Sequence, residues 1–126
     1  MEFSGPYADA YAVVISNTSA TTWSGEVLDL TTGSTAAHIG SWTVPDGSGG
    51  IAGSQLGFVE YFAPENCSTD PFTSVTFGVP IMLSGGTGSL SDASHTGNCV
   101  GVVPYESHRN DDGSVEISVG FNQTTS

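Results

Sequence analysis

The sequence predicts an all-β protein, a two-sheet β-sandwich of about seven to nine short strands. Short runs rich in β-branched and aromatic residues recur along the chain, separated by turns that contain Gly, Pro, Ser or Asn. No window shows the helical spacing of apolar residues that an amphipathic helix requires. Only 11% of the residues are charged, and Gly, Ser and Thr dominate, as is typical of exported β proteins. The 126 residues are expected to form one domain over 9–122, between an N-terminal tail, 1–8, and a C-terminal tail, 123–126.

Each predicted element follows from local composition. Strands are expected at 9–16, 21–30, 35–44, 56–63, 72–83, 98–104 and 114–121. Turns or loops are expected at 17–20, 31–34, 45–50, 64–71 and 84–97. The inward-facing candidates of the second strand are Trp23, Val27 and Leu30, and the third strand contains Ile39, Trp42 and Val44. Because proline has no N–H to donate, Pro80 requires the 72–83 strand to lie at a sheet edge or to end there.

The charge balance excludes two classes of partner. The chain has no lysine and a single arginine, Arg109, against 13 acidic residues, so its net charge is −12. Such a surface cannot neutralise phosphates, and nucleic acid is therefore excluded as a partner. Attraction to anionic lipid is excluded on the same ground. A halophilic origin can also produce an acidic chain, although usually with many more acidic residues.

Cysteine and asparagine patterns favour an oxidising compartment. Cys67 and Cys99 form an even pair, and we expect them to be bonded. Three sequons mark Asn17, Asn66 and Asn122 as glycosylation candidates. The alternative is a pair of reduced cysteines in a cytosolic protein. We therefore expect a secreted protein, whose opening Met1-Glu2-Phe3 resembles an expression-vector remnant that would have replaced a leader.

The sequence lacks the patterns of an enzyme, a metalloprotein or a membrane-spanning protein. No stretch approaches the length of apolar sequence that a transmembrane segment needs. The three histidines, His38, His95 and His108, have no metal-ligand spacing, and Ser94-His95 with Asp92 is poor geometry for a catalytic triad. The segment 110–114, Asn-Asp-Asp-Gly-Ser, is better explained as a hairpin turn than as a calcium loop. We expect no catalytic residue, no metal and no cofactor.

A series of short motifs runs in order along most of the chain. The residues that form these motifs are Asn17, Ser19, Thr22 and Trp23 in the first two strands, Val44-Pro45-Asp46-Gly47, Gly57 with Tyr61, then Val75, Phe77, Val79 and Pro80, and lastly Glu116, Ile117 and Val119. This series resembles the actinoporin-like proteins. The opening Ala10-Tyr11-Ala12 is also similar to the start of the aegerolysins, which are short acidic proteins. The resemblance implies a β-sandwich that recognises membrane lipids, with Trp23 in its core.

Two departures from the family pattern limit what carries over. Actinoporins have an amphipathic N-terminal helix, whereas only about ten residues precede the first strand here, so pore formation by this chain alone is not expected. The family's aromatic run after Val-Pro holds choline headgroups by cation–π contact. Here that run is Ile81-Met82-Leu83-Ser84-Gly85-Gly86. Of the headgroup positions, only Val79 and Pro80 match.

The sequence leaves three functions open. The first is recognition of a neutral or zwitterionic membrane lipid headgroup, with ligand-binding candidates Phe58, Tyr61, Val79, Pro80 and Tyr105. The second is a glycan-binding, lectin-like module in which Trp23 and Trp42 stack on sugars. The third is a toxin-like or effector-like domain with a protein partner.

Overall fold

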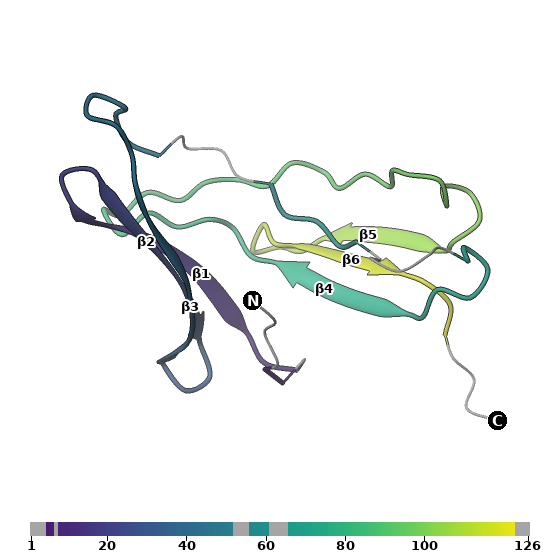
Figure 1. Ribbon diagram of the computed structural model, residues 1–126. Helices are drawn as coiled ribbons and strands as arrows, with labels where there is room; N and C mark the ends of the chain where they lie inside the picture. The colour runs from purple at the N-terminus through teal and green to yellow at the C-terminus, as the bar shows by residue number, and fades with distance from the viewer. Residues whose placement is uncertain (1–4, 7, 52–55, 61–65, 123–126) are drawn as a thin grey trace. The chain divides into compact units, whose positions relative to one another are not determined.

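The computed structural model describes residues 5–6, 8–51, 56–60 and 66–122 (Figure 1). These residues form six β-strands and no helix, so the all-β prediction is confirmed. The contacts divide the chain into two compact units, Met1–Gly53 and Ser54–Ser126, which we call the N-terminal and C-terminal units. Each unit contains one three-stranded antiparallel sheet. The sandwich arrangement and the single domain over 9–122 stay predictions.

The N-terminal unit contains three strands in the order β1-β2-β3 (Figure 1). They are β1 (Tyr11–Ser19), β2 (Thr22–Asp29) and β3 (Ser34–Thr43), which confirms the three strands predicted there. The turn that was predicted at 17–20 is shorter, because β1 continues to Ser19. The second turn closes where Asp29 accepts hydrogen bonds from the backbone N–H groups of Thr31 (2.7 Å) and Thr32 (3.2 Å). Gly33 completes that turn at a φ of 72°, which favours glycine.

One face of this sheet carries both tryptophans. In the strand register Trp23 of β2 pairs with Asn17 of β1 and with Trp42 of β3. Directly paired residues of antiparallel strands point to the same side, so these three side chains share a face. Trp23 is half-buried and Trp42 is 47% exposed, so neither is among the fully buried residues of the described chain. Alternation identifies the face that a residue shares, but it does not say how deeply that face is covered.

Two glycines form the floor beneath the Trp42 ring. A Cβ atom at Gly25 would lie 3.0 Å from Cη2 of Trp42, and one at Gly40 would lie 3.2 Å from its Cζ2. These two glycines are register partners in β2 and β3. The indole therefore lies across a strip of backbone that has no side chains. Gly25 is thus a close approach to Trp42, and the β2–β3 register also shifts between Gly25 and Glu26.

The C-terminal unit contains β4 (Thr73–Phe77), β5 (Tyr105–Arg109) and β6 (Val115–Val119), in the order β4-β6-β5. The β5–β6 connection is a tight hairpin, in which the N–H of Asn110 donates to the carbonyl of Ser114 (2.9 Å). Asp112 accepts bonds from the N–H and hydroxyl of Ser114, at 2.9 and 2.6 Å. The hairpin predicted at 110–114 is confirmed.

Three predicted strands of this unit differ from the structure. No strand is present over 56–60, and the remainder of the predicted 56–63 strand lies outside the described residues. The strand predicted at 72–83 ends at Phe77 and lies at a sheet edge, as Pro80 requires. The strand predicted at 98–104 is wrong, because Val102 and Val103 donate to the carbonyl of Cys99 in a turn and the strand begins at Tyr105.

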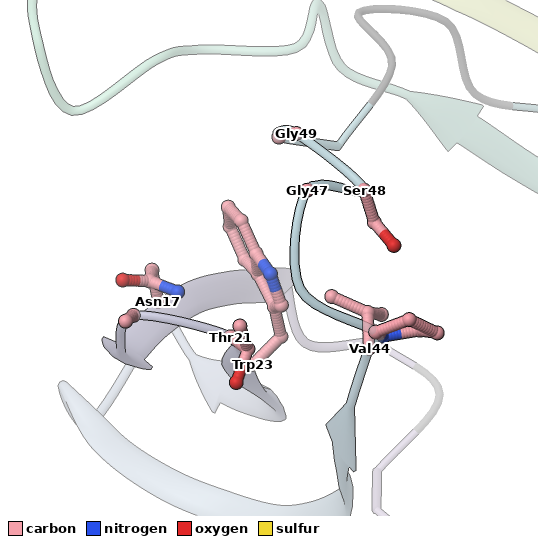
Figure 2. A pocket seen from close by; sticks show the side chains of 10 residues that line it. Asn17, Thr21, Trp23, Val44, Gly47, Ser48 and Gly49 are labelled. Atoms are coloured by element: carbon pink, nitrogen blue, oxygen red, sulfur yellow. The ribbon is translucent and has the colours of Figure 1, made fainter.

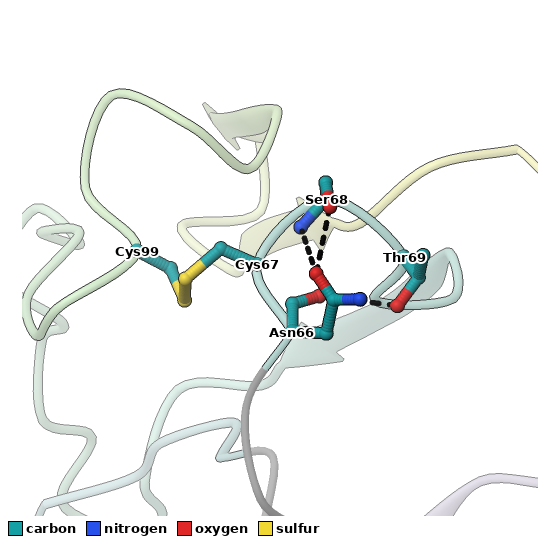
Figure 3. The surroundings of a disulfide bond; sticks show 5 residues. All are labelled: Asn66, Cys67, Ser68, Thr69 and Cys99. Atoms are coloured by element: carbon teal, nitrogen blue, oxygen red, sulfur yellow. Dashed lines mark hydrogen bonds between the residues drawn. A yellow bond between two sulfur atoms is a disulfide. The ribbon is translucent and has the colours of Figure 1, made fainter.

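A disulfide joins Cys67 to Cys99, as predicted, with 5.3 Å between the two Cα atoms (Figure 3). It links two segments without regular strands that are 32 residues apart in the sequence. Beside it, the hydroxyl of Ser68 donates to the side-chain oxygen of Asn66 at 2.7 Å. The disulfide therefore restrains the chain where strands do not.

Candidate functional site

A tight turn follows β4, and we call residues 80–88 the apolar turn. The N–H of Gly88 donates to the carbonyl of Pro80 at 2.8 Å, which closes the base of the turn. An antiparallel bridge joins Ile81 to Thr87. This closure leaves a short projecting segment that belongs to no sheet.

Three large apolar side chains occupy the first half of this turn. Ile81, Met82 and Leu83 are 73%, 61% and 90% exposed. They lie within residues 71–91, a stretch that contains no charged side chain. The sequence predicts these residues as the end of the 72–83 strand and as a departure from an aromatic pattern, and not as an exposed turn. The signal for the turn is three consecutive apolar residues between Pro80 and a Gly-Gly pair, in an uncharged stretch.

The two headgroup positions that match the family pattern form the base of the apolar turn. Val79 and Pro80 are both half-buried. A Cβ atom at Gly113 would lie 3.3 Å from Cγ1 of Val79, and one at Gly88 would lie 2.7 Å from Cγ of Pro80. Val79 and Pro80 therefore pack against the unit and hold the turn, whereas the residues after them are exposed.

Phe58 lies near the same end of β4. Its neighbour Gly57 is packed on the ring of Phe77, the last residue of β4, since a Cβ atom there would lie 2.7 Å from Cε1 of Phe77. Phe58 itself is 67% exposed. Tyr61, the other candidate of this segment, lies outside the described residues.

Tyr105 lies apart from the other candidates. It pairs with Val119 of β6, which in turn pairs with Thr73, so it occupies the opposite end of the sheet from Phe77. Its ring stacks on His95 with 4.9 Å between the ring centroids. Its hydroxyl is buried without a hydrogen-bond partner among the described residues. The structure therefore brings Phe58, Val79 and Pro80 to one end of the sheet but leaves Tyr105 at the other.

A second feature, which we call the Trp23 pocket, lies in the N-terminal unit. It is an open hollow of about 380 Å³ beside the indole of Trp23. Figure 2 shows this ring standing between Asn17 and the segment 44–49. The lining residues are Asn17, Ala20, Thr21, Trp23, Val44, Pro45, Gly47, Ser48, Gly49 and Gly50. All ten are uncharged, and one of them is aromatic.

Arg109, the only arginine, holds the segment 90–92 against the β5–β6 hairpin. Its guanidinium donates to the carboxylate of Asp92 at 2.8 Å and to the carbonyl of Leu90 at 3.0 Å. A third bond reaches the carbonyl of Gly113 at 3.3 Å. The single guanidinium is thus occupied by three acceptors of its own chain.

Two aspartates at turns have altered titration. Hydrogen bonds from the Ser114 hydroxyl and N–H lower the pKa of Asp112 below its ordinary value and outweigh an opposing effect of desolvation. Partial burial acts to raise the pKa of Asp29, but hydrogen bonds from Thr32 and Thr31 outweigh it and the pKa is lowered. Both carboxylates act as turn acceptors.

The other residues singled out by the sequence are dispersed. His95 stacks on Tyr105 and Asp92 binds Arg109, and no hydrogen bond joins either to Ser94 in the described part of the chain. No cluster of three His, Cys, Asp or Glu residues able to hold a metal is found among the residues described. The sequon residues Asn17, Asn66 and Asn122 are all exposed. Within the described ranges no helix is long and apolar enough to cross a bilayer.

Comparison of the chain with protein-family models, with curated proteins and with solved structures found no match. The actinoporin-like and aegerolysin-like resemblance therefore stays a prediction from the sequence motifs.

Proposed function

We propose that this chain is a secreted, non-enzymatic binding protein of the cytolysin β-sandwich type that attaches to neutral or zwitterionic membrane lipid. The observation that carries the proposal is the exposure of Ile81, Met82 and Leu83 on the apolar turn. Large apolar side chains that are exposed together mark interaction sites with proteins or membranes. The disulfide between Cys67 and Cys99 is compatible with secretion, because such bonds persist in oxidising compartments.

Charge supports a neutral or zwitterionic surface over an anionic one. The chain carries a net charge of −12, and its one arginine is occupied by acceptors of the chain itself. Residues 71–91 carry no charge that would have to be desolvated when the turn enters the headgroup region. The attraction is therefore short-ranged contact, which salt does not screen.

The size of the apolar turn supports weak and reversible attachment. Full burial of each of its three large side chains is worth about 1.5–3 kcal/mol, and the lost freedom of the bound protein offsets part of the sum. The expected membrane affinity is therefore close to that of a protein anchored by a single acyl chain. Because the contact is a short turn, we expect attachment without membrane leakage.

The test is co-sedimentation with vesicles of phosphatidylcholine, sphingomyelin or phosphatidylserine, at low and high salt, together with dye release. We expect binding to the first two lipids, unaffected by salt and without dye release. Leu83→Glu should weaken binding about tenfold or more, since it removes the burial of one leucine and adds a charge.

Val102→Glu is the control, because Val102 is an apolar residue of the C-terminal unit that is 54% exposed and shortly precedes Tyr105, at the end of the sheet opposite Phe77. This variant receives the same added charge away from the turn and should bind as the unmodified chain does. Preference for phosphatidylserine, loss of binding in salt, or equal effects of the two variants would contradict the proposal. Absence of binding to every vesicle would leave the glycan and protein-partner functions.

A further inference from the structure

The Trp23 pocket lies in the other unit from the apolar turn and has a different character. One wall is the half-buried indole of Trp23, with Val44 and Pro45 nearby. The remaining wall is the loop that follows β3, where Gly47 and Gly49 have φ values of 82° and 73°. These conformations favour glycine, so the loop presents backbone rather than side chains to the hollow.

The pocket has polar groups that the protein leaves available. Within the described residues, the N–H groups of Gly47, Gly49 and Gly50 make no hydrogen bond, whereas that of Ser48 donates to the carbonyl of Pro45 at 3.2 Å. Asn17 uses its Nδ2 to donate to the carbonyl of Thr22 at 3.1 Å, which leaves its amide oxygen as an acceptor. An aromatic face is thus combined with separate donors and acceptors.

This combination selects the chemical class of the ligand. None of the ten lining residues is charged, and residues 1–53 contain no lysine or arginine, so an anion gains no counter-charge. A quaternary ammonium is held by a cage of several aromatic rings, whereas only one ring lines this hollow. A ligand with an apolar face and a rim of hydroxyls matches an indole surrounded by neutral donors and acceptors.

We infer that the Trp23 pocket binds a neutral mono- or disaccharide, with a sugar ring against the indole of Trp23 and its hydroxyls toward Asn17 and the 47–50 loop. A hollow of about 380 Å³ is at the small end of ligand sites, which favours one or two sugar rings over a long glycan. Because the hollow is open and the ring is half-exposed, the affinity is weak, with a dissociation constant on the order of 1 mM.

The two tryptophans of the chain make a direct test possible. Proton–nitrogen correlation spectra of the ¹⁵N-labelled full chain, made in bacteria so that Asn17 carries no glycan, contain one indole N–H signal for each. Trp42→Phe assigns the two signals and also serves as the matched control, because Trp42 shares the face but does not line the pocket. The probes are glucose, galactose, mannose, N-acetylglucosamine, maltose, cellobiose, lactose and chitobiose, with phosphocholine as the competing ligand class.

We expect at least one sugar to shift the Trp23 signal saturably and to leave the Trp42 signal in place. Trp42→Phe should keep the dissociation constant within about twofold. Ala20→Phe should weaken binding about tenfold or more by filling the hollow, while its unchanged backbone signals in β3 show that the sheet is folded. No saturable shift with any sugar, equal shifts of both indoles, or a response to phosphocholine alone would overturn the inference. Lipid attachment through the apolar turn is independent of this outcome.

Discussion

Replacing Gly25 by alanine tests the contact between Trp42 and the strand beneath it. Gly25 is buried, and the added methyl group would meet Cη2 and Cζ3 of Trp42 at 3.0 Å and Cδ1 of Ile15 at 3.2 Å. Ordinary van der Waals contact begins several tenths of an ångström farther out, so the indole has to move. The substitution therefore creates a steric clash with two side chains, Trp42 and Ile15.

The expected sign follows from two opposing magnitudes. Removing a glycine from a strand gains about 0.5–1 kcal/mol through the reduced freedom of the unfolded chain. Inserting a methyl group into a packed contact costs about 1–3 kcal/mol. We expect Gly25→Ala to lower the free energy of unfolding by about 0.5–2 kcal/mol, the difference between the two. Gly78→Ala is the control, because a Cβ atom there would meet nothing within 4 Å, and it should be neutral or slightly stabilising.

The assay is urea unfolding followed by tryptophan fluorescence and by circular dichroism. A double-mutant cycle with Trp42→Ala isolates the contact, because without the indole only Ile15 opposes the methyl group. We expect Gly25→Ala to cost less in the Trp42→Ala background by about 1 kcal/mol. If Gly25→Ala stabilises the protein as Gly78→Ala does, or costs the same in both backgrounds, the indole does not lie on Gly25 and the described packing is wrong.

Two other changes have expected outcomes. The double variant Cys67→Ser, Cys99→Ser should lower the free energy of unfolding by about 4 kcal/mol, as measured by urea unfolding, because the loop of 32 residues is no longer closed in the unfolded chain. Thiol titration of the unmodified chain should find no free thiol. The lowered pKa of Asp112 stabilises the folded state above the unfolded pKa of about 3.9, and that contribution is lost as the pH falls through the lower folded value. Asp112→Asn should therefore flatten the decline in unfolding free energy below about pH 4, and an unaltered pH profile would assign the decline to other carboxylates.

Local patterns were sufficient to predict the three strands of the N-terminal sheet, the turn at 110–114 and β6. These strands combine β-branched and aromatic residues with turn residues at their ends, and both signals are local. The strand at Tyr105–Arg109 could not be predicted in the same way, because four of its five residues are polar or charged. It is an edge strand held by pairing with β6, and an edge strand with exposed side chains needs no apolar alternation. Because of the apolar residues at 100–103, a strand was predicted over 98–104 instead, although these residues form a turn after Cys99.

The candidate site depended on information that is not local. The sequence predicts Val79 and Pro80 within the 72–83 strand, whereas both follow its end at Phe77, and the exposure of Ile81 to Leu83 depends on how the turn closes. The same holds for Trp23, for which the family resemblance implied a place in the core. Its surroundings are instead a glycine-rich loop, which has too few side chains to cover an indole.

The three hydrogen bonds of Arg109 also determine how readily a protease cleaves the chain. Trypsin cleaves after lysine or arginine, and Arg109 is the one such residue in the sequence. Arg109 ends β5, its register partner is Val115, and its side chain is held by Asp92, Leu90 and Gly113. A protease needs its target in an extended, detached form, so cleavage requires the β5–β6 hairpin to open. At a low trypsin concentration, the rate at which this chain is converted into two fragments therefore reports the fraction of time for which that hairpin is open.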